Sequence, residues 1–343
     1  MPRRGRTTGR RPSRRWVAAA AILSVWLLAA CGGGGGKAIS DHLLVVRQAG
    51  IVELALSTGD EHLLLENPEG SLLVEPALSP DRRTIAYVRQ LNPIVVPGER
   101  AELGFDLFFA NRDGSNQHVV AEHQQPNDEI RAPSWFPDGR RLLVNTERLV
   151  NAQFQTDVEV LDVATGQRTV VAQGALRPAV SHDGQRVVFV RQDASLVETL
   201  WMANADGSDA HVIAGPDDAL GGFNSPRFSP DDTQLAFGAA PLLQSNSGGN
   251  AYVSRAPLRL LPSASNEANN GLPMNIWIMD VAGGAKRMLA QLELDLPSVA
   301  WSSDGARIFA LGGNGIYAVD PKGGSRRLGE GTFHGQLDWL SPN

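Results

Sequence analysis

The stretch Pro133-Ser134-Trp135-Phe136-Pro137-Asp138-Gly139, followed by Leu142-Leu143-Val144, decides the fold of this 343-residue chain. An apolar segment runs into a tight turn, and a second apolar segment follows the turn. In such a turn the Asp side chain accepts backbone hydrogen bonds and the Gly takes a left-handed conformation. The pattern therefore predicts two short antiparallel strands joined by a turn.

The same pattern returns along the chain. The other copies centre on Ser79-Pro80-Asp81, Ser181-His182-Asp183-Gly184, Ser229-Pro230-Asp231 and Ser302-Ser303-Asp304-Gly305. Between the copies lies a second motif, an apolar strand that ends in a polar turn, as in Asp106 to Gly114 and Thr199 to Gly207. Each unit thus supplies four short strands. A four-stranded repeat of about 40–45 residues is typical of a propeller blade.

Six blades follow if the two ends of the chain share one blade. The segment from His42 to Gln48 matches the second strand of the other units, and Gly50 to Ser57 and Glu61 to Glu66 supply the third and fourth. The segment from Gln336 to Asn343 matches a first strand. We therefore predict an all-β, six-bladed propeller of four-stranded blades, closed by a hybrid blade of one C-terminal and three N-terminal strands. Such closure removes exposed sheet edges.

These Ser-Pro-Asp-Gly repeats resemble those of the TolB family, whose six-bladed propellers are built from a variant of the WD-type blade. The resemblance covers roughly residues 42–343. It implies the propeller fold, and it implies partners among the lipoproteins of the bacterial cell envelope.

The first 30 residues are typical of an export signal. They hold seven Arg and no acidic residue, and the apolar stretch from Trp16 to Ala30 is shorter than the roughly 20 residues that span a bilayer. The ending Leu28-Ala29-Ala30-Cys31 resembles the bacterial lipobox, which implies cleavage before Cys31 and lipidation of its thiol.

Three segments follow from this interpretation: a lipoprotein signal peptide (1–30), a lipidated Cys with a glycine-rich tether (31–41) and the propeller (42–343). We expect the propeller to be extracytoplasmic and anchored to a membrane, on a periplasmic or cell-surface face. The sequence leaves open the membrane, the leaflet, and export by the Sec or the twin-arginine route.

Candidate catalytic groups are few. The repeated Asp residues are explained by turn chemistry rather than by a cation site. The seven His residues show no convergent spacing, although His182 replaces the Pro of its turn. No nucleophile elbow, zinc motif or phosphate loop occurs in the sequence. We therefore expect a protein without enzymatic activity, catalytic residues, metal or cofactor.

Net charge and loop composition point to the class of partner. The formal charge is −6 for the whole chain, and it excludes the basic face of a nucleic-acid binder. Residues 239–274 interrupt the fifth blade with a polar stretch that contains Leu258-Arg259-Leu260-Leu261, and residues 91–104 interrupt the second. Apolar residues in a long loop favour partner binding, and a harmless insertion is the alternative.

The sequence thus predicts a monomeric, lipid-anchored propeller that acts as a protein-interaction scaffold in the bacterial cell envelope. The alternative is a propeller-type polysaccharide lyase or glycan hydrolase with its site at the mouth of the channel. Nothing in the sequence names the partner or ligand.

Overall fold

A computed structural model describes residues 41–94, 102–125, 128–151, 153–242, 274–294, 296–312, 315–330 and 333–340. All of these residues belong to one compact unit, Ile39–Asn343. The predicted signal peptide, Cys31, most of the tether and the loop residues Leu258, Arg259, Leu260 and Leu261 lie outside the described residues.

The described strands group into six blades of four. Blade 1 holds β24 (His334–Leu340), β1 (His42–Arg47), β2 (Gly50–Ala55) and β3 (Glu61–Glu66). Blade 2 holds β4 (Ser71–Leu78), β5 (Thr84–Ile94), β6 (Glu102–Asn111) and β7 (His118–Ala121). Blade 3 holds β8 (Glu129–Trp135), β9 (Arg141–Val150), β10 (Gln153–Asp162) and β11 (Arg168–Gln173).

The second half of the ring repeats this order. Blade 4 holds β12 (Ala175–Val180), β13 (Arg186–Gln192), β14 (Glu198–Asn204) and β15 (His211–Ala214). Blade 5 holds β16 (Leu220–Phe228), β17 (Gln234–Pro241), β18 (Met274–Asp280) and β19 (Arg287–Leu294). Blade 6 holds β20 (Ser298–Trp301), β21 (Ile308–Gly312), β22 (Gly315–Val319) and β23 (Ser325–Glu330). A short 3₁₀ helix, η1 (Pro216–Asp218), precedes blade 5.

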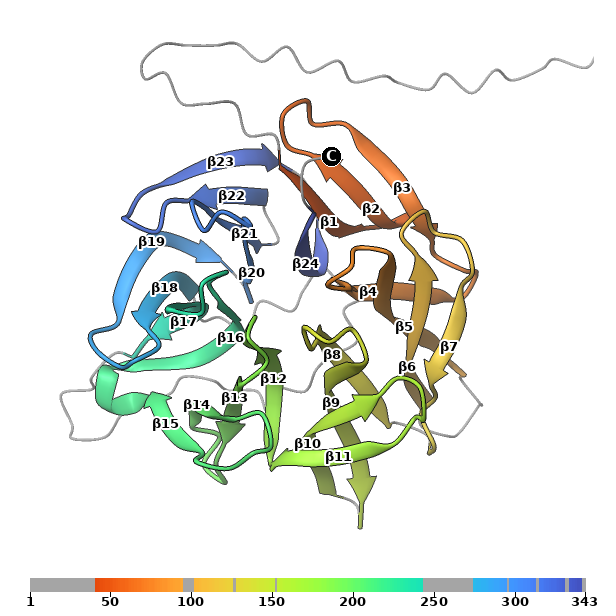
Figure 1. The fold of residues 1–343 in the computed structure, drawn as a ribbon, viewed down its shortest axis with the longest axis horizontal. Coiled ribbons are helices and arrows are strands. Elements are labelled where there is room, and N and C mark those ends of the chain that lie inside the picture. Colours follow the sequence, from red (N-terminus) through yellow and green to blue (C-terminus); the bar gives the residue numbers. More distant parts are fainter. Residues whose placement is uncertain are drawn as a thin grey trace, which may run out of the picture. The chain divides into compact units, whose positions relative to one another are not determined.

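The chain closes its ring through blade 1, as the sequence predicts. Strand β24 pairs antiparallel with β1, so that Trp339 lies opposite Leu43 and Asp338 opposite Leu44. Figure 1 shows the blue β24 beside the red-orange β1 at the inner end of this blade. The two segments that form the blade are thus nearly 300 residues apart in the sequence, from His42 to His334.

The predicted irregular segments are shorter than expected. Strand β5 runs on to Ile94 and β6 begins at Glu102, with Leu91 paired to Gly104 and Ile94 to Glu102. Continued ladder pairing thus converts both ends of the segment 91–104 into strand. In the same way β17 extends to Pro241 and β18 begins at Met274.

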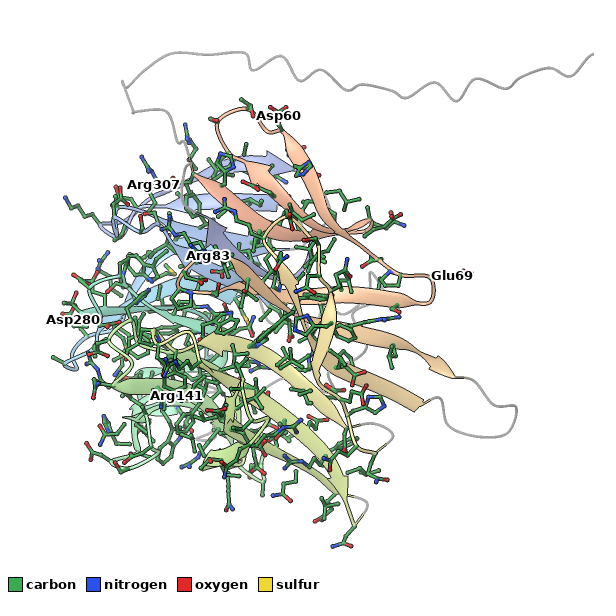
Figure 2. All side chains as sticks on the ribbon, turned by 45° about the vertical axis from the view of Figure 1, so that its right-hand side comes forward. Asp60, Glu69, Arg83, Arg141, Asp280 and Arg307 are labelled. Atoms are coloured by element: carbon green, nitrogen blue, oxygen red, sulfur yellow. The ribbon has the colours of Figure 1, made fainter. Side chains whose placement is uncertain are left out.

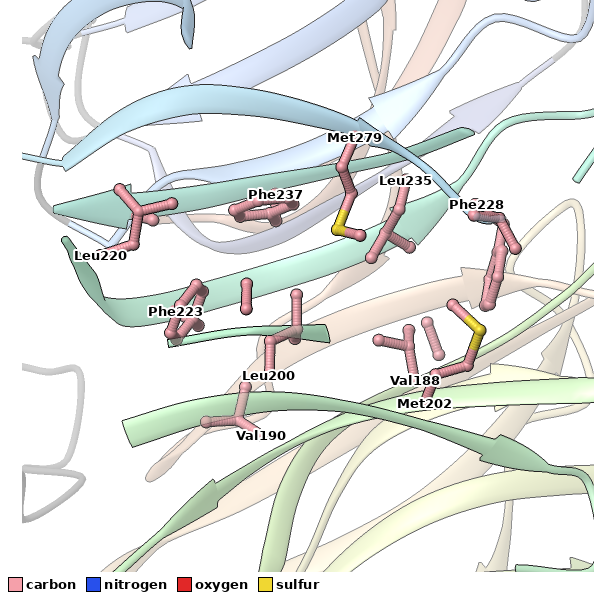
Figure 3. Packing of buried hydrophobic residues seen from close by; sticks show 14 residues of the cluster. Val188, Val190, Leu200, Met202, Leu220, Phe223, Phe228, Leu235, Phe237 and Met279 are labelled. Carbon is pink, nitrogen blue, oxygen red and sulfur yellow. The ribbon is translucent and has the colours of Figure 1, made fainter. Parts of the chain in front are cut away.

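Most second strands are apolar on both faces because each blade is packed between two others. In β1, Leu43 and Val45 pack into a cluster shared with blade 6, whereas Leu44 and Val46 pack into one shared with blade 2. Figure 3 shows such an interface, in which Val188 and Leu200 of blade 4 face Phe223 and Phe237 of blade 5. These continuous apolar runs therefore match a stack of blades rather than a sheet with one wet face.

A β-bulge marks the Pro at which each repeat begins. The residue before this Pro has a positive φ in five blades: Glu75 (54°), Ala132 (51°), Arg177 (53°), Ser225 (46°) and Leu296 (41°). The strand register shifts at this point in blades 2 to 5. The bulge turns the innermost strand locally and frees polar groups from the ladder.

Polar groups of the innermost strands bond across the junctions between blades. The N–H of Leu78 donates to Asp338 (2.7 Å), that of Ala132 to Glu75 (2.7 Å), and that of Val180 to the Ser134 hydroxyl (3.2 Å).

The other three junctions are bonded in a comparable way. The N–H of Val299 donates to Ser225 (3.1 Å) and that of Leu337 to Ser298 (3.0 Å). At the junction of blades 4 and 5, Arg177 donates to the carbonyl of Phe223 (2.7 Å). Each of the six junctions thus carries a hydrogen bond close to the axis.

Two serines test this ring of bonds. Ser225 and Ser298 are each 1% exposed. We expect Ser225→Ala and Ser298→Ala each to lower the free energy of unfolding by about 1–3 kcal/mol, because a buried N–H loses its acceptor. Urea denaturation measures the loss, and Ser57→Ala, at an exposed turn, serves as the control. Equal stability of the three variants would show that these bonds contribute nothing.

Candidate functional site

The repeated Asp residues hold their turns, as predicted. In the turns of blades 2, 4, 5 and 6 the hydroxyl of the preceding Ser donates to the Asp carboxylate at 2.6 Å. These hydroxyl bonds, with backbone N–H bonds, hold the pKa of Asp81, Asp183, Asp231 and Asp304 below its ordinary value. Each of these carboxylates therefore stabilises its own turn through hydrogen bonds.

His182, which replaces a Pro, belongs to a contact between turns. At the junction of blades 3 and 4, Pro137 packs against Gly184, where a Cβ would lie 2.9 Å from the proline ring. At the junction of blades 4 and 5, the corresponding pair is His182 and Asp232. The Asp232 carboxylate accepts the N–H groups of His182 and Asp183 (both 2.7 Å), and its Oδ1 lies 3.1 Å from His182 Nδ1. The hydrogen-bonded pair of His182 and Asp232 thus takes the place that the van der Waals contact of Pro137 with Gly184 has at the previous junction.

Three other described imidazoles have local partners. His42 Nδ1 lies 2.7 Å from Glu53 Oε1, and the Nδ1 atoms of His118 and His211 lie 2.9 and 2.8 Å from carbonyls two residues away. Within the described ranges, no three His, Cys, Asp or Glu side chains are arranged to hold a metal ion.

A cavity lined mainly by charged and polar residues lies where blade 2 meets blade 3. It has a volume of about 390 Å³, and we call it the blade 2–3 pocket. Its lining residues are Glu122, His123, Gln124, Asp128, Glu129, Ile130, Thr146, Glu147, Arg148, Gly166 and Arg168. They come from the β7–β8 connection, the start of β8, the end of β9, and the turn before β11 with the start of that strand.

Two glutamates face each other in this pocket. Glu129 on β8 and Glu147 on β9 are direct partners in the strand ladder. Like charges in directly opposed positions destabilise a sheet. Burial raises the pKa of Glu129 to about 7, with Glu147 and Glu75 acting in the same direction against the nearby Arg131. Burial also raises the pKa of Glu147.

Arg131 lies behind these glutamates and is committed mainly to Glu75. Its Nη2 and Nε atoms donate to Glu75 Oε1 at 2.7 and 3.1 Å, whereas its Nη1 lies 3.5 Å from Glu129 Oε2. The guanidinium also stacks over the Phe105 ring, 4.7 Å from its centroid. One cation therefore serves two glutamates, and Glu129 receives the weaker bond.

The two arginines that line the pocket differ in their surroundings. Arg148 forms ion pairs with Asp157 (3.6 Å) and Glu159. Burial lowers the pKa of Arg168, against the attraction of Glu159.

His123 is held at the pocket wall by Asp106. One oxygen of this carboxylate accepts the backbone N–H of His123 (2.7 Å) and lies 2.6 Å from its Nδ1. The imidazole packs against Gly104, where a Cβ would lie 2.5 Å from the ring. Gly104 is therefore required for this position of His123.

An apolar tip projects from the same edge of blade 3. Leu149 (43% exposed), Val150 (44%) and Phe154 (54%) lie at the end of the β9–β10 hairpin, and we call them the blade 3 tip. Leu149 is paired with Phe154 across the strands. Both strands are ten residues long, and in Figure 1 their ends extend beyond the neighbouring blades.

The blade 3 tip lies on the face toward which all second strands run. Because every blade has the same antiparallel order, the ends of β5, β9 and β17 reach one face of the ring. Two other long second strands, β5 and β17, end on the same face, at Ile94 and Pro241. Three departures from the regular repeat therefore occur on one side.

The sequence analysis missed the pocket, although a signal was present. At the position of Val88-Arg89-Gln90 in blade 2 and Val190-Arg191-Gln192 in blade 4, blade 3 has Asn145-Thr146-Glu147. An acidic residue, Glu147, thus stands on the strand that lines the cavity where these two blades have a neutral Gln. The contribution of the β7–β8 connection had no such signal.

No protein-family model matches the chain. A Tol-Pal system protein TolB from Anaeromyxobacter dehalogenans is 30% identical over 113 residues, which are 32% of this chain and 24% of that protein. An uncharacterized protein from Agrobacterium fabrum is 26% identical over 166 residues, 46% of this chain and 52% of that protein. The chain therefore spans about half, or less, of the curated relatives it matches.

Among solved structures, TolB from Acinetobacter baumannii matches with a TM-score of 0.59 at 16% identity, over 89% of this chain and 67% of that chain. A chain of the nidogen/laminin complex matches at 0.60 and 14% identity, over 87% and 98%. The described domain is a TolB-like β-propeller. An oligogalacturonate lyase in complex with manganese has a similar fold, with a TM-score of 0.51 at 16% identity over 82% of this chain and 70% of that chain.

The raised pKa of Glu129 predicts how stability depends on pH. Between its ordinary pKa of 4.5 and about 7, the folded protein keeps a proton that the unfolded chain has released. Stability contributed by this group therefore falls as the pH rises through this window. We expect Glu129→Gln to be more stable than the unsubstituted protein at pH 8 by about 3 kcal/mol, and nearly equal to it at pH 4.

Thermal or urea unfolding of both proteins from pH 4 to pH 8 measures this difference. Glu69→Gln, at an exposed turn, should show no such trend. A difference between Glu129→Gln and the unsubstituted protein that stays constant with pH would contradict the shifted titration.

Proposed function

We propose that this chain is a lipid-anchored, extracytoplasmic β-propeller that binds a protein partner in the bacterial cell envelope. The blade 3 tip carries the proposal, because exposed apolar side chains gathered on a projecting hairpin are typical of a protein interaction site. The hydrogen-bonded ring beneath the tip supplies a rigid base for it.

Two further observations support this proposal. Sequence relatives of the chain are TolB proteins of the Tol-Pal system. Strand β17, which comes before the segment with Leu258, Arg259, Leu260 and Leu261, ends at Pro241 on the same face as the blade 3 tip. We propose that this segment contributes a second apolar contact to the same partner.

Membrane attachment rests on the lipobox at Leu28, Ala29, Ala30 and Cys31. Among the described residues, no helix has the length and apolar character needed to cross a bilayer. Acyl chains on Cys31 would instead provide the anchor, since each buried methylene contributes about 0.8 kcal/mol.

Removal of the thiol tests the anchor. Cys31→Ser should incorporate no labelled palmitate and should leave the membrane fraction for the soluble fraction, because no thioether can form. Immunoblotting of fractionated cells measures the change. Palmitate labelling that persists in Cys31→Ser would contradict lipid attachment at Cys31.

Substitution of the apolar residues of the blade 3 tip tests its role in partner binding. We expect the double variant Leu149→Ser/Phe154→Ser to lose the partner that crosslinks to the unsubstituted protein in intact cells. Val212→Ser removes an equally exposed apolar side chain from β15 and should keep the partner. An identical set of crosslinked proteins for both variants would contradict a binding role for the tip.

A polysaccharide lyase or glycan hydrolase is the alternative function. The observation that favours it is the pair Glu129 and Glu147, because glycosidases use two carboxyl groups, one of which stays protonated near neutral pH. Cleavage of uronate polymers or other glycans by the purified domain, with or without added divalent metal, would support this alternative if Glu129→Gln or His182→Ala abolished it. A scaffold should show no turnover.

A further inference from the structure

We propose that the blade 2–3 pocket receives a lysine side chain of the protein partner, with its ammonium group between Glu129 and Glu147. This inference rests on the proposed scaffold function, and it names the chemistry of one contact. Three lines of observation support it: an excess of carboxylates, a nearly buried glutamate with one oxygen that accepts no hydrogen bond in the described ranges, and the size of the cavity.

The pocket has more anions than cations. Four carboxylates line it, from Glu122, Asp128, Glu129 and Glu147, against the two guanidinium groups of Arg148 and Arg168. Arg148 is already paired with Asp157 and Glu159, both of which are buried. The remaining compensation is partial, because Arg168 attracts Asp128 and Arg131 lies 3.5 Å from Glu129, and the carboxylates still outnumber these cations.

Glu129 presents an unpartnered oxygen to the cavity. Its side chain is 9% exposed, and only its Oε2 approaches Arg131. In the part of the chain that the structure describes, Oε1 of Glu129 accepts no hydrogen bond, and Glu147 forms no hydrogen bond or ion pair. A buried carboxylate gains most from a cation that also donates hydrogen bonds, because its desolvation is otherwise uncompensated.

The shape of the site favours a lysine. A cavity of about 390 Å³ is large enough for an alkyl chain, and the ranges that the structure describes contain no metal-holding group. Ile130 and the methyl group of Thr146 also line the cavity and suit the methylene stem of a lysine. An ammonium group donates three hydrogen bonds in different directions, which suits two carboxylates that face each other from separate strands.

The pocket continues into the blade 3 tip along one strand. Strand β9 supplies Thr146, Glu147 and Arg148 to the pocket and Leu149 and Val150 to the tip. A partner segment with a lysine next to apolar residues would contact both. The charged pocket would then fix the register of a contact whose area is mainly apolar.

Titration calorimetry with two probes tests the proposal on the folded domain. The probes are Nα-acetyl-lysine methylamide and a five-residue peptide amide with one lysine between leucines. We expect both to bind, the peptide more tightly because it also covers the blade 3 tip. Glu129→Gln and Glu147→Gln should each weaken binding by about tenfold or more, because each removes a charge-assisted hydrogen bond. The control Glu69→Gln, labelled in Figure 2 on the β3–β4 turn, should bind normally.

Two matched arms sharpen the result. The Nε-acetylated forms of both probes keep their shape and lose the charge, and they should not bind in the pocket. Glu147→Lys should place a cation beside Glu129 from within the chain, so it should abolish probe binding and remain at least as stable as the unsubstituted protein.

Binding of the acetylated probes with equal affinity, or binding unchanged in both glutamine variants, would overturn the lysine assignment. Crosslinking in cells separates this failure from failure of the scaffold proposal. A partner that is retained by Glu129→Gln and Glu147→Gln but lost from the tip variant would leave the scaffold in place and remove only the pocket contact.

Discussion

At each junction between neighbouring blades, a side chain beside the axis pairs with a backbone N–H or carbonyl of the adjoining blade. The rest of the ring depends on this constraint. On the innermost strand of each blade, some backbone groups point toward the axis and have no ladder partner, and a buried group of this kind must find another partner. The side chain that meets it comes from a different blade in every case. These six local bonds, together with polar contacts such as those of His182 with Asp232 and of Arg131 with Glu75, fix the angular position of blades whose interfaces are otherwise mainly apolar.

The same junctions also show how one blade depends on its neighbour. At Gly184 and Gly305, each of which follows the turn Asp, a Pro of the preceding blade lies against the Gly: Pro137 in the first case and Pro230 in the second. Where Asp232 replaces that Gly, the preceding blade has His182 in place of Pro, and the two form a hydrogen-bonded pair. The replacement of Pro by His182 is thus matched by the replacement of Gly by Asp232 in the next blade, and the two residues form a structural pair. Such pairs are visible only when neighbouring repeats are compared position by position.

The fold could be predicted from the sequence because the same turn residues and apolar strand segments recur in every unit. Three features of the sequence each predict a four-stranded blade: the Ser-Pro-Asp-Gly turns, the apolar runs and the matching chain ends. Hydrogen bonds at Asp81, Asp183, Asp231 and Asp304 confirm the predicted role of Asp in the turns. The pocket could not be predicted in the same way. Its charge arises from residues of two blades, such as His123 and Glu147, whose proximity depends on how the blades meet. The one sequence signal on β9 was Glu147, an acidic residue where the second strands of blades 2 and 4 have Gln90 and Gln192.

The pairing of β24 with β1 has a consequence for the biogenesis of the domain. A ribosome makes β1, β2 and β3 first, and β24 only after all other blades. Until then, the hydrogen-bonding groups on the inner edge of β1 have no strand to meet, and such an edge attracts other extended chains. Blade 1 is therefore open to wrong pairing until β24 has been synthesised. A chaperone that covers this edge would prevent such pairing while the rest of the chain is still emerging.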